Sequence, residues 1–310
     1  GTYLGEMTDE ADQGYSEAVR AALEGGINFL DTSLNYRHQR SERAIGAALS
    51  AAPLPRQQYV VCTKAGYLVP DAMPVARLRA SDVVGNMHSM APLFLDDQLQ
   101  RSRRNMGLDT IDVFYLHNPE TQLRYISSDV FYEERIRAAF TCCEAMAASG
   151  RIRYYGAATW DGFRRNGLAD GLSLVRLAAI AKQVAGENHH FRFIQLPFNL
   201  GMTEAFGQRA EQIGDQRLNI MEAAARLGIS VIASATLLQA RLTSGLPEQL
   251  AQLVPGAEVP DAVRAIQFTR SAPGISVALV GMGKPAHVAA NLGIAAVPPI
   301  APDSFTNLFG

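Results

Sequence analysis

Short apolar runs alternate along this chain with longer segments whose apolar residues recur at helical spacing. The short runs predict buried strands, and the longer segments predict amphipathic helices. The expected strands cover residues 27–31, 59–64, 111–117, 152–157, 193–196, 229–233 and 277–280. The expected helices cover residues 15–23, 41–52, 92–107, 136–147, 174–184, 218–227 and 261–271, with a last short helix from Pro285.

This alternation predicts a parallel sheet in which each helix crosses back over the strands. Seven complete units follow one another, and Gly1, Thr2 and Tyr3 look like the tail of one further strand. Eight such units predict an α/β fold of the closed (β/α)8 type, a TIM barrel, here lacking part of its first strand at the N-terminus. The chain begins without Met, so we expect residues upstream of position 1. No change in composition marks a linker, and residues 1–310 are expected to form a single domain.

The composition excludes several classes of protein. Hydrophobic residues make up 48% and charged residues 19%, as in an ordinary globular protein. The net charge is -2 without a long basic run, so neither nucleic acid nor a membrane surface is an expected partner. No apolar run approaches the ~20 residues that span a bilayer, and no signal peptide is visible. Cys62, Cys142 and Cys143 form no disulfide framework, and reduced thiols indicate a cytoplasmic location.

Four ionisable residues stand at or just beyond the ends of three successive strands. Asp31 ends the first strand and Tyr36 lies in the loop after it, while Lys64 and His117 end the next two. Each of them alone has a structural explanation. Asp31 could be a strand-to-turn signal, Tyr36 a loop aromatic, Lys64 the partner of Asp31 in a structural ion pair, and His117 a core histidine. Together they lie where α/β barrels build their active sites. The connection 65–91, which is long and without a period, is expected to shape the pocket beside them.

The four residue types suit the reduction of a carbonyl group by an external hydride donor. A tyrosine has a reference pKa of about 10, and a neighbouring ammonium such as that of Lys64 lowers this pKa and eases proton donation. Lys64 needs a carboxylate partner to stay charged, and Asp31 is the expected one. His117 can then donate a hydrogen bond to the carbonyl oxygen of the substrate. No metal is expected, because the adjacent His189 and His190 lack the spacing of metal ligands.

The segment 26–36, followed by Arg40-Ser41-Glu42 and Ile45-Gly46, resembles the signature of the aldo-keto reductases. The resemblance covers nearly the whole chain. It implies a (β/α)8 barrel, a nicotinamide dinucleotide as cofactor and no metal. It also implies that the family's four catalytic places are taken by Asp31, Tyr36, Lys64 and His117, with Tyr36 as the general acid.

The same resemblance implies where the nicotinamide half of the cofactor binds. Gln195 matches the glutamine that binds the carboxamide, whereas Thr159 stands where the family usually has Ser-Asn. Ser234 replaces an aromatic residue that often stacks on the nicotinamide, so stacking would need another residue such as Trp160. The predicted cofactor-binding residues of this part are Gly1, Thr2, Tyr3, Asp31, Thr159, Gln195 and Ser234.

The segment 280–286 contains the pattern G-x-G-x-x-A, but no βαβ unit follows it, so a Rossmann domain is not expected. A glycine-rich turn at a helix N-terminus nevertheless binds phosphate, and barrels favour that site after their last strands. By the resemblance this turn and helix hold the adenosine end. Lys284 can meet a 2′-phosphate, which favours NADP over NAD. The predicted residues are Gly281, Met282, Gly283, Lys284, His287 and Asn291.

The sequence therefore predicts an NAD(P)-dependent oxidoreductase that interconverts an aldehyde, ketone or sugar and the corresponding alcohol. One alternative is a regulatory or redox-sensing subunit of the same fold that binds the cofactor with little turnover. Another is a barrel isomerase or lyase that uses no nicotinamide. The expected partner is a small-molecule carbonyl or alcohol, and no pattern in the chain selects one substrate or one oligomeric state.

Overall fold

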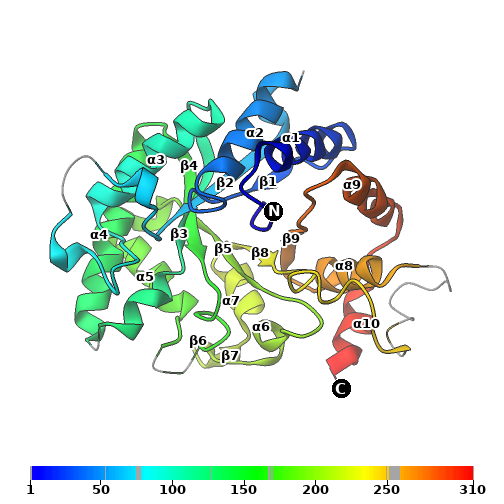
Figure 1. Cartoon of the computed structure of the whole chain (residues 1–310). Coiled ribbons are helices and arrows are strands. Elements are labelled where there is room, and N and C mark those ends of the chain that lie inside the picture. Colours follow the sequence, from blue (N-terminus) through cyan, green and yellow to red (C-terminus); the bar gives the residue numbers. More distant parts are fainter. Residues whose placement is uncertain are drawn as a thin grey trace.

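The computed structural model describes residues 2–52, 54–74, 78–126, 128–166, 168, 170–248, 250 and 259–309. Its centre is one parallel sheet of seven strands in the order β1-β2-β3-β4-β5-β8-β9. The strands pair with their successors along the chain, and the sheet curls with the helices outside it (Figure 1). Their bounds are Phe29–Asp31, Val60–Ala65, Ile111–His117, Ile152–Ala158, Phe191–Pro197, Ser230–Ser234 and Ile275–Ala278. The predicted α/β barrel class is confirmed.

The helices cover the outer face of the sheet, and neighbours along the chain pack on one another from α1 to α5. The long ones are α1 Asp9–Glu24, α2 Arg40–Ala51, α3 Pro92–Met106, α4 Asp129–Ala148, α5 Leu174–Ala185, α7 Ile220–Arg226, α8 Asp261–Ser271 and α9 Pro285–Leu292. The short ones are α6 Glu204–Gly207 and α10 Pro302–Thr306. A hairpin of β6 Glu211–Ile213 and β7 Gln216–Leu218 was not expected from the sequence.

Local signals set several helix ends. Thr8 Oγ1 accepts the N–H of Ala11 at 3.2 Å, so α1 begins before the apolar stretch that predicted it. Asn219 and Glu222 form a capping box at the start of α7. Gly107 ends α3 with a left-handed φ of 65°, a conformation that glycine adopts without steric penalty.

The barrel sheet of the described residues holds seven of the eight expected strands. Thr2 and Tyr3, expected to end a first strand, belong to no strand, and Gly1 lies outside the described residues. Thr2 instead bonds through its side chain to Thr32 Oγ1 at 2.9 Å and accepts from Ser41 Oγ at 2.7 Å through its carbonyl. β1 and β9 are therefore the two outer strands, with no pairing between them in the described part of the chain.

The gap between β1 and β9 is closed by helices rather than by strand pairing. A cavity of about 280 Å³ lies there, lined mainly by aliphatic side chains of α1, β1, α8 and β9. Ala18 and Ala22 of α1, which also line the cavity, pack against Val288 of α9. We refer to this contact between the two helices as the α1–α9 seam (Figure 1). The ring of helices is thus continuous at the place where the sheet is open.

None of the helices in the described part of the chain is long and apolar enough to cross a bilayer. The expected pocket-shaping connection after β2 contains two short 3-10 helices, Pro70–Ala72 and Ala80–Asp82. Backbone bridges within it join Tyr67 and Val84 to His88, and His88 hydrogen-bonds to the carbonyl oxygen of His117 at the end of β3. The connection therefore lies against the end of β3 and the side chains there.

Candidate active site

A buried ion pair forms the floor of the site. Lys64 Nζ lies 2.7 Å from Asp31 Oδ1 and donates also to the carbonyl oxygen of Thr32 at 2.7 Å. Only 1% of the Lys64 side chain and 4% of the Asp31 side chain are exposed. Burial alone would lower the pKa of Lys64, but Asp31 and Tyr36 raise it above its usual value. The expected partnership of Lys64 and Asp31 is confirmed, and the ammonium stays charged.

Tyr36 lies directly beside this pair, with the Lys64 ammonium 5.0 Å from the centre of its ring. Burial raises the pKa of the Tyr36 phenol, and Lys64 lowers it by less, so the net direction is upward. The sequence predicted only the lowering by lysine, because burial in the barrel mouth cannot be read from residue types. The phenol is therefore a protonated donor at neutral pH.

His117 completes the group at the end of β3. Its ring meets that of Tyr36 edge to face, with the centroids 5.8 Å apart, and its Nδ1 lies 3.2 Å from Ser33 Oγ. Burial, together with the nearby Lys64 and His88, lowers the pKa of His117 well below its usual value. The imidazole is consequently neutral and can hydrogen-bond to a carbonyl oxygen. All four predicted catalytic residues come together.

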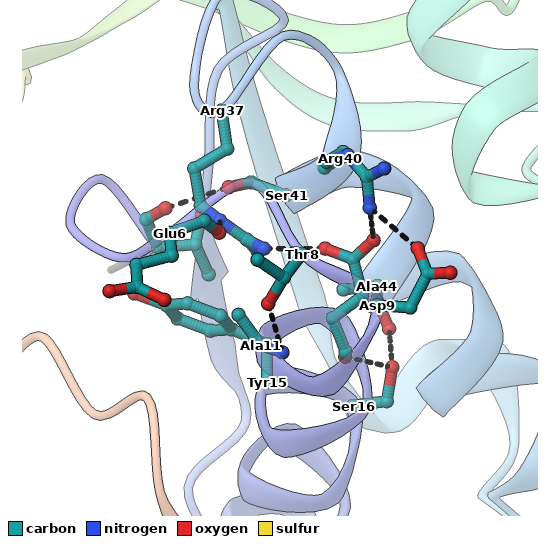
Figure 2. Close-up of polar contacts among 12 residues, drawn as sticks. Glu6, Thr8, Asp9, Ala11, Tyr15, Ser16, Arg37, Arg40, Ser41 and Ala44 are labelled. Carbon is teal, nitrogen blue, oxygen red and sulfur yellow. Dashed lines mark hydrogen bonds and ion pairs between the residues drawn. The ribbon is translucent and has the colours of Figure 1, made fainter.

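The loop that presents Tyr36 is fixed by Arg37 (Figure 2). The buried Arg37 guanidinium lies 2.5 Å from Asp12, donates to the carbonyl oxygen of Glu6 at 2.9 Å and covers the ring of Tyr15. Arg37 and the two residues after it have left-handed backbone angles, an uncommon run outside glycine. These contacts tie the loop to α1 and to the N-terminal segment, whose Tyr3 ring meets Tyr36 at 5.1 Å.

The predicted carboxamide-binding residues lie at the same edge of the sheet. Gln195 of β5 donates through Nε2 to Asp31 Oδ2 at 2.8 Å, so Asp31 serves both Lys64 and Gln195. Thr159 follows β4, and its backbone N–H bonds to the carbonyl oxygen of Gln195 at 2.8 Å. Both side chains are nearly buried. Their role toward a cofactor remains a prediction.

The loop after β8 carries a feature that the sequence did not predict. Ser234 ends the strand, and the Thr236 side chain behind it is buried with no hydrogen-bond partner for Oγ1 among the described residues. Ala235, Leu238 and Gln239 have left-handed φ angles. Left-handed residues and an unpaired buried hydroxyl cluster at binding loops, and barrels bind phosphate in this region.

The glycine-rich turn stands where the sequence placed it. Residues 281–284 connect β9 to α9, Lys284 is the N-cap residue, and Pro285 occupies the first turn. Lys284 and His287 are exposed, whereas Met282 and Asn291, with Thr2 and Asp31, line the cavity between β1 and β9. The turn therefore lies at a helix N-terminus, and binding of the adenosine end there stays a prediction.

Glu120 is a supporting residue that the sequence analysis missed. Its Oε1 accepts three backbone N–H groups, those of Trp160 at 2.8 Å, Asp161 at 3.1 Å and Gly162 at 3.3 Å. It thereby shapes the loop after β4. The signal was available, because Glu120 follows the end of β3 closely, as Asp31 ends β1.

The adjacent His189 and His190 are each paired with a charged side chain. The described residues contain no group of three or more side chains that could hold a metal ion. His190 Nδ1 is instead paired with Glu144 at 2.6 Å, and His189 with Arg192 at 2.9 Å. The two histidines thus have separate partners.

Comparison with known proteins agrees with this geometry. The model of the aldo/keto reductase family matches residues 3–176, more than half of the chain. D-threo-aldose 1-dehydrogenase from Pseudomonas sp is 30% identical over 44% of this chain and 41% of its own length. L-galactose dehydrogenase from Arabidopsis thaliana is 31% identical over 44% of this chain and 36% of its own. The chain thus spans about two-fifths of the length of the curated relatives it matches.

A solved structure extends the similarity of fold to the whole chain. The aldo/keto reductase from Klebsiella pneumoniae, in complex with NADP and acetate, superposes with a TM-score of 0.68. That match covers 99% of this chain and 88% of the other at 18% identity, which supports the fold alone. Together with the family match over residues 3–176, the barrel and its four clustered side chains identify this chain as a member of the aldo/keto reductase family.

Proposed function

We propose that this chain is an NAD(P)-dependent oxidoreductase that interconverts a small carbonyl compound and an alcohol. The observation that carries the proposal is the buried Asp31–Lys64 pair beside the phenol of Tyr36 and the neutral ring of His117. A protein that only binds a cofactor has no need of a charged lysine buried beneath a tyrosine. The proposal therefore favours an enzyme over a regulatory subunit.

In this proposal Tyr36 gives its proton to the carbonyl oxygen as negative charge develops there. The positive charge of Lys64, held in place by Asp31, stabilises the phenolate that remains. His117 orients the carbonyl through a hydrogen bond. In the oxidative direction the same phenolate accepts the proton of the alcohol.

The residues suit a nicotinamide dinucleotide, which supplies or accepts the hydride when bound. The unpaired Thr236 hydroxyl, the left-handed loop after β8 and the turn before α9 offer groups for its phosphates. Gln195 and Thr159 are proposed for the carboxamide, and the exposed Lys284 for a 2′-phosphate. NADP is the proposed cofactor, with NAD as the other possibility.

Relatives named for aldose and galactose oxidation suggest a sugar or another small aldehyde or ketone as the substrate. We further propose that residues 1–310 act as one barrel domain, supported by the single sheet that takes strands from β1 to β9. A cytoplasmic location, inferred from the reduced thiols, is part of the same proposal; the three cysteines are free.

A side-by-side titration of the protein with NADPH and NADH tests the proposal, followed by turnover on a panel of aldoses, aldehydes and ketones. We expect tight binding of at least one nucleotide, tighter for NADPH, and turnover of some member of the panel. A folded protein that binds neither nucleotide would refute the oxidoreductase. Tight binding with no turnover of any compound would favour the regulatory alternative.

A further inference from the structure

A chain of buried hydrogen bonds leads from α4 to the backbone of His117. His88, which is fully buried, places its Nε2 2.7 Å from the carbonyl oxygen of His117. On the other side of the ring, Gln122 Nε2 lies 2.8 Å from His88 Nδ1. Arg135 of α4 donates to Gln122 Oε1 and, at 2.6 Å, to the carbonyl oxygen of Ser81. The sequence analysis singled out neither His88 nor Gln122 nor Arg135.

The donors and acceptors in this series of hydrogen bonds allow the proton of the neutral His88 ring on only one of its two nitrogens. A guanidinium can only donate, so Gln122 must present its carbonyl oxygen to Arg135 and its N–H to His88. His88 Nδ1 is then an acceptor, and the proton lies on Nε2, where it meets the carbonyl oxygen of His117. Burial is the main factor that lowers the pKa of His88, to about 4, so the ring remains neutral.

The hydrogen bond from His88 reaches His117 at the residue where β3 ends. The next residue, Asn118, turns into a left-handed conformation with φ of 48° and donates to the hydroxyl of Tyr67 at 2.9 Å. The Tyr67 ring meets both His88 and His117 edge to face, at 5.2 and 5.1 Å between centroids. Position 66 has room only for a glycine, because a Cβ there would lie 2.4 Å from the His117 carbonyl oxygen.

We propose that His88 is a positioning residue for His117, held in its Nε2–H tautomer by the carbonyl oxygen of His117 and by the amide of Gln122, which Arg135 orients. This inference rests on the proposed function, in which His117 orients the carbonyl. His88 touches no reacting atom. It fixes the main chain that carries the His117 ring, and a displacement of about 1 Å in such a group lowers turnover by about a hundredfold.

The kinetic test compares His88→Leu with His88→Gln, which keeps an N–H donor near the position of Nε2. We expect His88→Leu to lower kcat by at least about tenfold with little change in the Kd for NADPH, and His88→Gln to recover part of the loss. His190→Leu, which removes a histidine outside the site, is the matched control. Wild-type kcat in folded His88→Leu would overturn the proposal.

A second readout does not depend on turnover. In the protein without nucleotide, 15N NMR of histidine side chains is expected to report the Nε2–H tautomer for His88. The Arg135→Met variant frees Gln122 to turn its amide, so it should shift the His88 and His117 ring signals while the carbonyl oxygen of His117 keeps the proton on Nε2. An Nδ1–H tautomer for wild-type His88, or His117 signals unmoved by His88→Leu, would refute the positioning role of His88. Absence of all turnover in the wild-type protein would refute the proposed function, while these spectra still test whether His88 positions His117.

Discussion

Gln195 Nε2 lies 2.8 Å from Asp31 Oδ2 while Lys64 Nζ lies 2.7 Å from Asp31 Oδ1, so one buried carboxylate joins β1, β2 and β5. The two strands β1 and β5 do not neighbour each other in the sheet. The bond therefore crosses the barrel mouth. Asp31 therefore keeps Lys64 charged and, through its bond to Gln195, also sets the distance between β1 and β5 across the site.

Asp31→Asn is expected to lower the free energy of unfolding by about 3–5 kcal/mol, because Lys64 is then buried without a counter-ion. Chemical denaturation measures the change. The double variant Asp31→Asn/Lys64→Met removes the stranded charge and should recover most of the loss. If the double variant is no more stable than the single one, the ion pair is not the source of the effect.

Tyr36→Phe is expected to lower kcat by about 10²–10⁴-fold, the usual contribution of a general acid. The Kd for NADPH should stay nearly unchanged, because the ring remains in place. Steady-state kinetics and a nucleotide titration measure the two quantities separately. Turnover of the Phe variant at the wild-type rate would exclude Tyr36 as the proton donor.

Gly66→Ala is expected to lower both stability and turnover. The added Cβ would lie 2.4 Å from the His117 carbonyl oxygen and 2.7 Å from His88 Nε2, so the end of β3 must move. Overpacking of this kind costs about 1–3 kcal/mol. Gly207→Ala is the matched control, since among the described residues beyond its own helix backbone and chain neighbours no atom lies within 4 Å of a Cβ there. Equal kcat and equal unfolding free energy in the two variants would contradict the close approach.

The buried histidines make stability depend on pH below neutrality. A base whose pKa is lowered in the folded state stabilises the fold fully above its unfolded pKa of about 6.5 and loses that contribution as the pH falls. For His88, with a folded pKa of about 4, the loss between pH 7 and pH 5 is about 2 kcal/mol. The difference in unfolding free energy between wild type and His88→Gln should shrink by that amount.

This comparison isolates His88, because other groups that titrate in the same range are common to both variants. Glu42 and Glu120 have raised pKa values and act in the opposite direction. The ionisable groups that face His88 are Arg135, His117 and Tyr67, and all three remain in the variant. A difference that does not change with pH would show that His88 is protonated equally in the folded and unfolded states.

Lys284→Met is expected to raise the Kd for NADPH by about three- to tenfold, the effect of losing one exposed charge contact, and to leave the Kd for NADH unchanged. Lys182→Met, an exposed lysine on α5, is the control. Fluorescence titration gives the ratio of variant Kd to wild-type Kd for each of the two variants with each of the two nucleotides. Equal effects on NADPH and NADH would remove the 2′-phosphate contact from the proposal.

Much of the site could be predicted because short stretches of sequence carry its signals. An acid at the end of an apolar run marks Asp31, and the same pattern placed Lys64 and His117 on neighbouring strands. The upward shift in the pKa of Tyr36 could not be predicted, since it depends on burial by distant segments. His88 also escaped notice, because a single histidine in a connection without a period gives no local signal.

The fold was predictable to a similar degree. Buried strands such as β3, with all seven residues buried, follow from apolar runs. The start of α1 was missed because residues 9–14 are largely polar and only the cap at Thr8 announces them. The hairpin of β6 and β7 has strands of three residues, too short for an alternating pattern to stand out.

The α1–α9 seam also has a consequence for how the chain folds. It brings together the first helix and a helix near the end of the chain, while each strand pair in the sheet joins successive barrel strands. Contacts that close a long loop lose more chain entropy before any contact energy is gained, so local pairs form earlier. We therefore expect the curled sheet to grow strand by strand and to close into a ring at the seam last, through small apolar side chains instead of backbone pairing.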